Sequence, residues 1–120
     1  MAKRILVVDN EPDLLKIVVF RLKKSGYEIL TARDGQEALD LLEKNRPDLI
    51  LLDLILPRVS GYDVCRRIKA DDMLRHIPII GFTASTYKIQ EKFKDMGVEG
   101  YLIKPFELEE LLEKIRKFIG

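Results

Sequence analysis

The chain has 120 residues, of which 47% are hydrophobic and 34% are charged. This length matches one ordinary domain, and the composition excludes a disordered chain. The 21 basic and 20 acidic side chains are scattered along the sequence and leave a formal net charge of +1, so neither nucleic acid nor an anionic membrane is an expected partner.

The predicted elements alternate between short apolar runs and longer stretches of helical periodicity. In chain order, the predicted strands are residues 4–8, 27–32, 48–52, 77–82 and 100–103. The predicted helices run from Pro12 to a stop at Ser25-Gly26 and then cover residues 35–45, 61–70, about 86–96, and 107–119. Asp34 and Ser60 are placed to cap the second and third helices.

Two of the strands, 5–8 and 49–52, contain only apolar residues, which is typical of central parallel strands that are buried on both faces. Right-handed crossovers then distribute the helices over both faces of the sheet. We therefore expect an α/β fold, a (βα)5 doubly wound sandwich, in which residues 1–120 form a single domain with no output domain in this chain.

Cys65 is the only cysteine, which excludes an internal disulfide framework. The N-terminus has no apolar segment that precedes a cleavage site or that is long enough to cross a bilayer. These features favour a cytoplasmic protein. The single histidine, His76, cannot form a histidine-based catalytic or metal cluster by itself.

Polar side chains follow four of the five predicted strands: Asp9, Asn10 and Glu11, then Asp53, then Thr83, and finally Lys104. Because ligands bind beyond the carboxyl ends of the strands in an open parallel sheet, these groups are expected to converge on one site. Each residue alone has an ordinary explanation, such as a loop cap or a solvated lysine. Their arrival at one edge from separate strands favours a functional site.

Crowded carboxylates repel one another, and Mg²⁺ with oxygen ligands relieves that repulsion. An aspartate can also attack phosphorus and form an aspartyl phosphate, while a metal ion and a lysine neutralise charge on the phosphoryl oxygens. The predicted site contains every group that this reaction needs.

Five segments in this order and spacing resemble the receiver domains of two-component response regulators, from Ile5 to about Phe118: residues 7–12, 48–57, 61–64, 79–85 and 100–106. The resemblance implies the flavodoxin-like strand order 2-1-3-4-5. It also implies a phosphorylation-activated signalling switch that does not act as a turnover enzyme.

By the same resemblance, Asp53 is the phosphoacceptor, and Asp9, Asn10 and Asp53 form the Mg²⁺ pocket together with the backbone carbonyl of Ile55. Lys104 pairs with the phosphoryl group, and we expect a cis peptide bond between it and Pro105.

Thr83 and Ala84 are implied to respond to the phosphoryl group, with the Thr83 hydroxyl as a donor to one phosphoryl oxygen. Tyr101 then swings inward behind Thr83 and couples phosphorylation to the face built from the fourth helix, fifth strand and fifth helix. The implied partners are a histidine kinase or phosphotransfer protein and a downstream protein target. The implied oligomeric state is a monomer or a phosphorylation-dependent dimer.

The chain departs from the family pattern at Asn10, where a second acid usually ligates the metal. Asparagine keeps an oxygen ligand but lacks the negative charge, so we expect weaker Mg²⁺ binding than is usual for the family. Glu11 is a candidate to compensate, although the sequence leaves the direction of its side chain open. Ile55 and Ser85 are poorly suited to orienting an attacking water, which predicts a long-lived phosphorylated form.

Two other functions fit the same architecture. A flavin or dinucleotide enzyme would need glycines or hydroxyls in the first strand-to-helix loop, and no GxGxxG or P-loop occurs, so no such cofactor is expected. A receiver-like interaction module with weak or no phosphorylation is favoured only by Asn10.

Overall fold

The computed structural model describes residues 2–84 and 87–120, in which strands and helices alternate. The strands are β1 (Arg4–Val8), β2 (Glu28–Ala32), β3 (Leu49–Asp53), β4 (Ile79–Thr83) and β5 (Gly100–Ile103). The helices are α1 (Pro12–Lys24), α2 (Gly35–Lys44), α3 (Gly61–Ala70), α4 (Ile89–Met96) and α5 (Leu108–Ile119). All strand pairs are parallel and the order is β2-β1-β3-β4-β5, so the predicted fold and strand order are confirmed.

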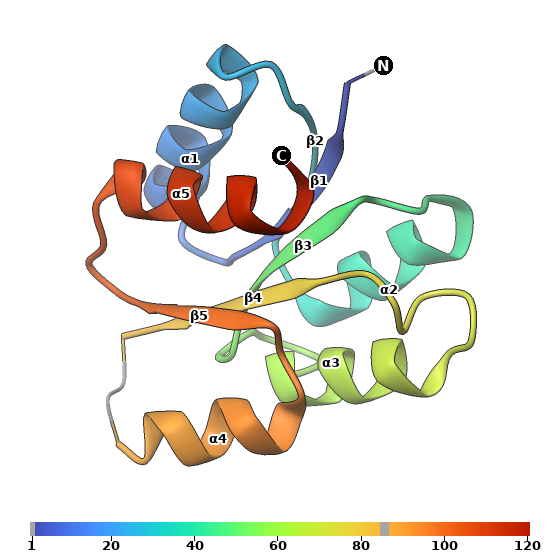
Figure 1. Cartoon of the computed structure of the whole chain (residues 1–120). Coiled ribbons are helices and arrows are strands. Elements are labelled where there is room, and N and C mark those ends of the chain that lie inside the picture. The colour runs from blue at the N-terminus through green and yellow to red at the C-terminus, as the bar shows by residue number, and fades with distance from the viewer. Residues whose placement is uncertain (1, 85–86) are drawn as a thin grey trace.

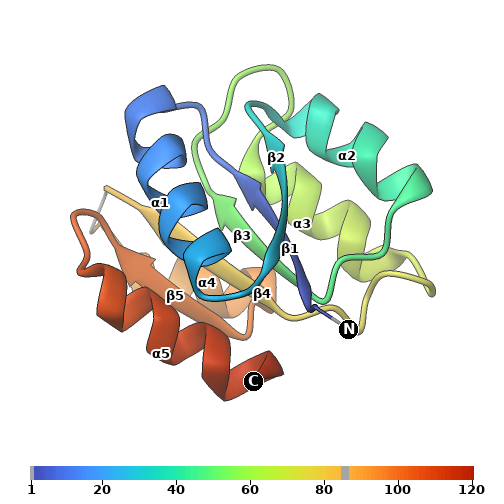
Figure 2. The same ribbon diagram turned by 90° about the horizontal axis from the view of Figure 1, so that it is seen from above.

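The sheet lies between two helical layers (Figures 1 and 2). Helices α1 and α5 lie above the sheet in Figure 1, and α2, α3 and α4 lie below it. Because successive side chains of a strand point to opposite faces, each buried strand contributes to two separate apolar cores. In β3, for example, Leu49 and Leu51 pack with α1 and α5, whereas Ile50 and Leu52 pack with α2 and α3.

Two predicted boundaries are wrong by a few residues. Helix α4 begins at Ile89 and not near residue 86, because Lys88 has a left-handed φ of 49° that a helix cannot include. Residue 86 lies outside the described part of the chain. Strand β4 begins at Ile79, since the Ile77 amide is used in a turn to the Leu74 carbonyl and Pro78 has no N–H to pair.

The helix N-termini next to the carboxyl edge are fixed by local contacts. Asp34 accepts a hydrogen bond from the Glu37 amide at 2.8 Å, and Ser60 accepts one from the Asp63 amide at 3.2 Å. Gly61 donates its amide to the Leu54 carbonyl at 3.0 Å, and a Cβ at this position would overlap the Asp53 carbonyl oxygen. The glycine therefore lets α3 approach the end of β3 closely.

No described helix has both the length and the apolar composition to cross a membrane. Cys65 is fully buried on α3, and its Sγ lies 3.2 Å from the Met96 carbonyl oxygen. Burial raises the pKa of the Cys65 thiol. This cysteine therefore has the properties of a core residue and not those of a reactive thiol.

Candidate functional site

The polar groups predicted from separate strands meet at the carboxyl edge of the sheet. Asp9 follows β1, Asp53 ends β3, Thr83 ends β4, and Lys104 follows β5. The side chains of Asp9, Asp53 and Lys104 are 1%, 6% and 9% exposed, and Thr83 is also buried. Polar groups are rarely buried to this extent unless they contact one another or a ligand.

Lys104 is the centre of this cluster. Its Nζ lies 3.0 Å from Asp9 Oδ2, 3.0 Å from Glu11 Oε1 and 3.1 Å from Asp53 Oδ2. The contacts to Glu11 and Asp53 are hydrogen bonds, whereas the contact to Asp9 is an ion pair outside hydrogen-bond geometry. One ammonium group thus faces three carboxylates. The peptide bond from Lys104 to Pro105 is cis, as predicted.

The Asp53 carboxylate is held in one orientation by two different contacts. Its Oδ1 accepts a hydrogen bond from the Ile55 amide at 3.1 Å, and its Oδ2 accepts one from Lys104. The side chain of Ile55 itself is 65% exposed. Ser85, which the sequence placed on the path of an attacking water, lies outside the described residues.

The charges at this edge shift two pKa values. Desolvation by burial raises the pKa of Asp53, and the opposing effects of the Ile55 amide and of Lys104 do not restore its ordinary value. Burial alone would lower the pKa of Lys104, but the hydrogen bond to Glu11 and the charge of Asp53 outweigh burial and raise it. Lys104 therefore stays charged at neutral pH. Its single positive charge is smaller than the summed negative charge of the carboxylates around it.

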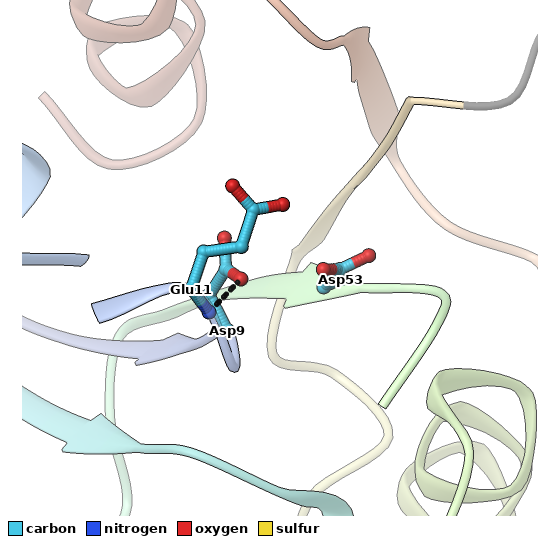
Figure 3. Close-up of side chains that lie close together, drawn as sticks. All are labelled: Asp9, Glu11 and Asp53. Carbon is cyan, nitrogen blue, oxygen red and sulfur yellow. Dashed lines mark hydrogen bonds between the residues drawn. The ribbon is translucent and has the colours of Figure 1, made fainter. Parts of the chain in front are cut away.

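Glu11 is a further member of this cluster, and both Glu11 and its neighbour Asn10 are exposed to solvent. Oxygen atoms of Asp9, Glu11 and Asp53 all lie within 4.8 Å of one another. Figure 3 shows Asp9 and Asp53 at the ends of adjacent strands, with the Glu11 side chain extending beside them. The Glu11 amide donates to Asp9 Oδ1 at 2.9 Å, and this bond ties the start of α1 to the end of β1.

These residues fit a divalent cation with oxygen ligands. The Oδ2 atom of Asp9 is fully buried and has no hydrogen bond among the described residues, although Lys104 balances part of its charge. A small, hard dication such as Mg²⁺ is bound by one or two carboxylates with additional oxygen ligands, which this edge can supply.

Tyr101 lies on β5, the strand that leads into Lys104. It is half-buried, and its ring stacks on Phe93 of α4 with a centroid distance of 4.8 Å and an interplanar angle of 13°. Phe93 in turn occupies the space above Gly81, where any Cβ would overlap its ring. Gly81 pairs with Tyr101 across β4 and β5, so the three residues form one contact between α4 and the sheet.

Comparison with known proteins identifies the class of this fold and site. The sequence profile of the response regulator receiver domain matches residues 5–116, and the chain belongs to this family. Receiver domains are phosphorylation-dependent signalling switches and not turnover enzymes; they bind Mg²⁺ at an acidic pocket and interact with histidine kinases and downstream targets. Nothing in the similarity to these proteins favours the alternative of an interaction module with weak or no phosphorylation.

Among curated proteins, the chain is similar to the polar-differentiation response regulator DivK of Brucella anthropi, with 40% identity over 121 aligned positions that cover all of this chain and 98% of the relative. DivK of Brucella ovis is 39% identical over the same coverage. Among solved structures, the chemotaxis response regulator CheY4 of Vibrio cholerae matches with a TM-score of 0.92 and 30% identity, over 99% of this chain and 100% of that chain.

A second solved structure is the receiver domain of a sensor histidine kinase from Pseudomonas aeruginosa PAO1. It matches with a TM-score of 0.92 and 33% identity, over 100% of this chain and 99% of that chain. That protein was solved with a magnesium ion coordinated in its active-site cleft.

Sequence reasoning did not place two residues of the site region. The sequence left the direction of the Glu11 side chain open, because a residue that follows a strand through an irregular turn can point in several directions. Phe93 was an apolar position of α4 with nothing to distinguish it. The clue for Phe93 was Gly81, since a glycine inside a strand signals a close approach by another group.

Proposed function

We propose that residues 1–120 act as one receiver domain in which Asp53 accepts the phosphoryl group. The observation that carries this proposal is the contact of Lys104 with both Asp9 and Asp53, which brings together side chains from three separate strands. A buried ammonium beside a buried carboxylate is arranged to neutralise a phosphoryl group that is transferred to that carboxylate.

In the proposed reaction, an oxygen of the Asp53 carboxylate attacks phosphorus. A P–O bond to Asp53 forms as the P–N bond to the phosphohistidine of the donor breaks, and the imidazole leaves and takes up a proton. The Ile55 amide fixes the carboxylate plane, so the attacking oxygen needs no reorientation. Lys104 then pairs with a phosphoryl oxygen, and the Thr83 hydroxyl donates to another.

We place Mg²⁺ at the same edge, with Asp9, Asn10, Asp53 and the Ile55 carbonyl as its protein ligands. When bound, the cation neutralises the carboxylates and the charge that develops on the phosphoryl oxygens. Asp9 is the fixed part of this set, because its Oδ1 is used by the Glu11 amide while its Oδ2 faces the cluster.

The signal would leave the site through Thr83, Ala84 and Tyr101. Movement of Thr83 and Ala84 toward the phosphoryl group would open space for Tyr101 to turn inward and leave its stack on Phe93. A cavity of about 150 Å³ beside Thr83, lined in part by Ile89 of α4, gives the start of that helix room to move. The face of α4, β5 and α5 would then present a different surface.

The partners that fit this proposal are a histidine kinase or phosphotransfer protein as the donor and a protein target for the changed face. We propose a cytoplasmic location for the protein, because such a donor would carry its phosphohistidine there. The domain would act as a monomer or as a dimer that forms on phosphorylation.

The test is incubation with acetyl phosphate and Mg²⁺ followed by intact-protein mass spectrometry. The proposal predicts a gain of about 80 Da in the wild type and in Asp63→Asn, a control that removes an exposed acid on α3, and no gain in Asp53→Asn. A gain that survives in Asp53→Asn contradicts the assignment. No gain in the folded wild type contradicts the proposed function itself.

A further inference from the structure

Glu11 is the one member of the carboxylate cluster whose direction the sequence left open, although it was a candidate to compensate for Asn10. Its Oε1 lies 3.0 Å from Lys104 Nζ, and its carboxylate lies within 4.8 Å of oxygen atoms of Asp9 and Asp53. Asn10, which the sequence placed in the metal pocket, is exposed and carries no charge. The acid that lies beside Asp9 and Asp53 is Glu11, one position further along the chain.

The charges around Lys104 are unbalanced. Three carboxylates contact a single ammonium, which leaves an excess of about two negative charges in a space only a few ångströms across. A dication matches this excess and a second ammonium group would not. The same three acids therefore provide both the counter-charge of Lys104 and a set of ligands for a dication.

Glu11 differs from the other two carboxylates in its exposure to solvent. Its side chain is 58% exposed, whereas those of Asp9 and Asp53 are buried. Glu11 occupies the N-cap position of α1 but makes no side-chain capping bond, so its carboxylate can move without loss of helix capping. Its amide is held by Asp9 Oδ1 at 2.9 Å, which fixes the point from which the side chain swings.

We propose that Glu11 takes the place of the acid that this chain lacks at position 10, and that its carboxylate exchanges Lys104 for the bound cation. The inference rests on the proposed function of the site. In the cation-free protein, Glu11 helps to hold Lys104. When the cation arrives, Glu11 turns to it directly or through a bound water, and Lys104 is released from one of its three contacts.

This exchange has a consequence for the phosphoryl group. Lys104 cannot pair fully with a phosphoryl oxygen while three carboxylates share it, because each contact competes for the same three N–H donors. Removal of Glu11 from Lys104 on cation binding leaves a donor available. Through the Glu11 side chain, cation binding thereby increases the ability of Lys104 to donate to a phosphoryl oxygen.

The test is a calorimetric titration with MgCl₂ in the absence of any phosphoryl donor. We expect Glu11→Gln to weaken Mg²⁺ binding about tenfold, because it keeps an oxygen ligand and removes one charge beside a dication. Asp13→Asn removes the same charge two residues along, in the first turn of α1 and outside the cluster, and should change the affinity less than twofold. The Glu11→Gln effect should shrink in an Asn10→Asp background, since the two acids would serve the same cation.

A second measurement follows the NMR resonance of the Glu11 side-chain carboxyl carbon during the same titration. Its resonance should move with the Mg²⁺ saturation curve, whereas that of Glu109 should not. Equal Mg²⁺ affinities of Glu11→Gln and Asp13→Asn, or a wild type that binds no Mg²⁺, overturn the inference. Phosphoryl uptake by the wild type with acetyl phosphate separates the two outcomes: if the mass gain is present, only the role of Glu11 has failed, and if it is absent at saturating Mg²⁺, the proposed function has failed.

Discussion

On the two faces of the sheet, buried side chains contact hydrocarbon, whereas at its carboxyl edge they contact charge. The cores on these faces contain residues such as Leu42 of α2 and Ile115 of α5, which are fully buried among other apolar groups. The edge contains Asp9 and Asp53, which are buried almost as deeply beside a single Lys104. Burial of the first kind stabilises the fold, and burial of the second kind costs free energy unless each charge is paired.

The difference teaches which part of the molecule carries the fold and which part carries the reaction. The apolar contacts on the two faces of the sheet are complete without any phosphoryl group. The edge is left with more negative than positive charge, an excess that a bound cation would neutralise and that a transferred phosphoryl group would increase. Substitutions in the two regions should therefore have separable effects on stability and on phosphorylation.

The largest effect is expected from Lys104→Met. This change removes the only cation that the described residues place among the three carboxylates, and phosphoryl uptake should fall at least about a hundredfold. Lys69→Met is a matched control, because Lys69 forms an ion pair with Glu99 at 2.9 Å beside the first residue of β4, at the opposite edge of the sheet. Initial rates of phosphoryl uptake from acetyl phosphate are measured for both variants. Equal rates would show that Lys104 takes no part in the reaction.

A core substitution tests the other side of the comparison. Leu42→Ala on α2 removes a side chain that is 2% exposed and should lower the free energy of unfolding by about 3 kcal/mol. Phe20→Ala, at a position that is 68% exposed, should change it by less than about 0.5 kcal/mol. Urea unfolding gives both values. The folded Leu42→Ala protein should still gain the phosphoryl mass, and loss of that gain would break the separation between faces and edge.

A smaller effect is expected from Asn10→Asp. The added charge should raise Mg²⁺ affinity at least about tenfold, because a unit charge near a dication is worth more than 1.4 kcal/mol even at a high dielectric. Without Mg²⁺ the same change adds a further carboxylate to an edge that already has an excess, so the melting temperature should fall and then recover when MgCl₂ is added. Equal affinities in a calorimetric titration of the two forms would show that position 10 does not face the cation.

The smallest effect concerns stability and pH. Burial raises the pKa of Asp53 above its ordinary value of 3.8, so the folded state favours the protonated carboxyl group. The stability that protonated Asp53 contributes is fully present below pH 3.8 and is lost as the pH rises through the folded-state pKa. At pH 7 the ionised Asp53 therefore lowers stability, and Asp53→Asn should melt at a higher temperature than the wild type. The difference should shrink as the pH falls toward 3.8. A lower melting temperature at pH 7 would mean that Lys104 more than offsets the burial of this carboxylate.

The sequence alone predicted the fold and the residues that meet at the edge, because both depend on patterns with few alternatives. Unbroken apolar runs such as residues 49–52 define central parallel strands, and residues that follow such strands reach the same edge whatever the details of the loops. The start of α4 was not predictable in this way, since it depends on the left-handed backbone of Lys88.

The direction of Glu11 and the stack of Phe93 on Tyr101 also depended on geometry that no local pattern encodes. Glu11 reaches the cluster because its own amide is tied to Asp9, a contact between two loop residues. Phe93 reaches Tyr101 because Gly81 leaves space on β4 for its ring. Both results come from how elements pack and not from the propensities of the residues.

The central claim is that, of the three clustered carboxylates, Asp53 is the one that forms a bond to phosphorus. The most direct measurement is to phosphorylate the protein with acetyl phosphate and Mg²⁺, reduce the acyl phosphate with borohydride, and locate the resulting homoserine by peptide mass spectrometry. The account predicts homoserine at position 53 alone. Homoserine at position 9, which would also form from a phosphorylated aspartate, or the corresponding reduced glutamate at position 11, would contradict it.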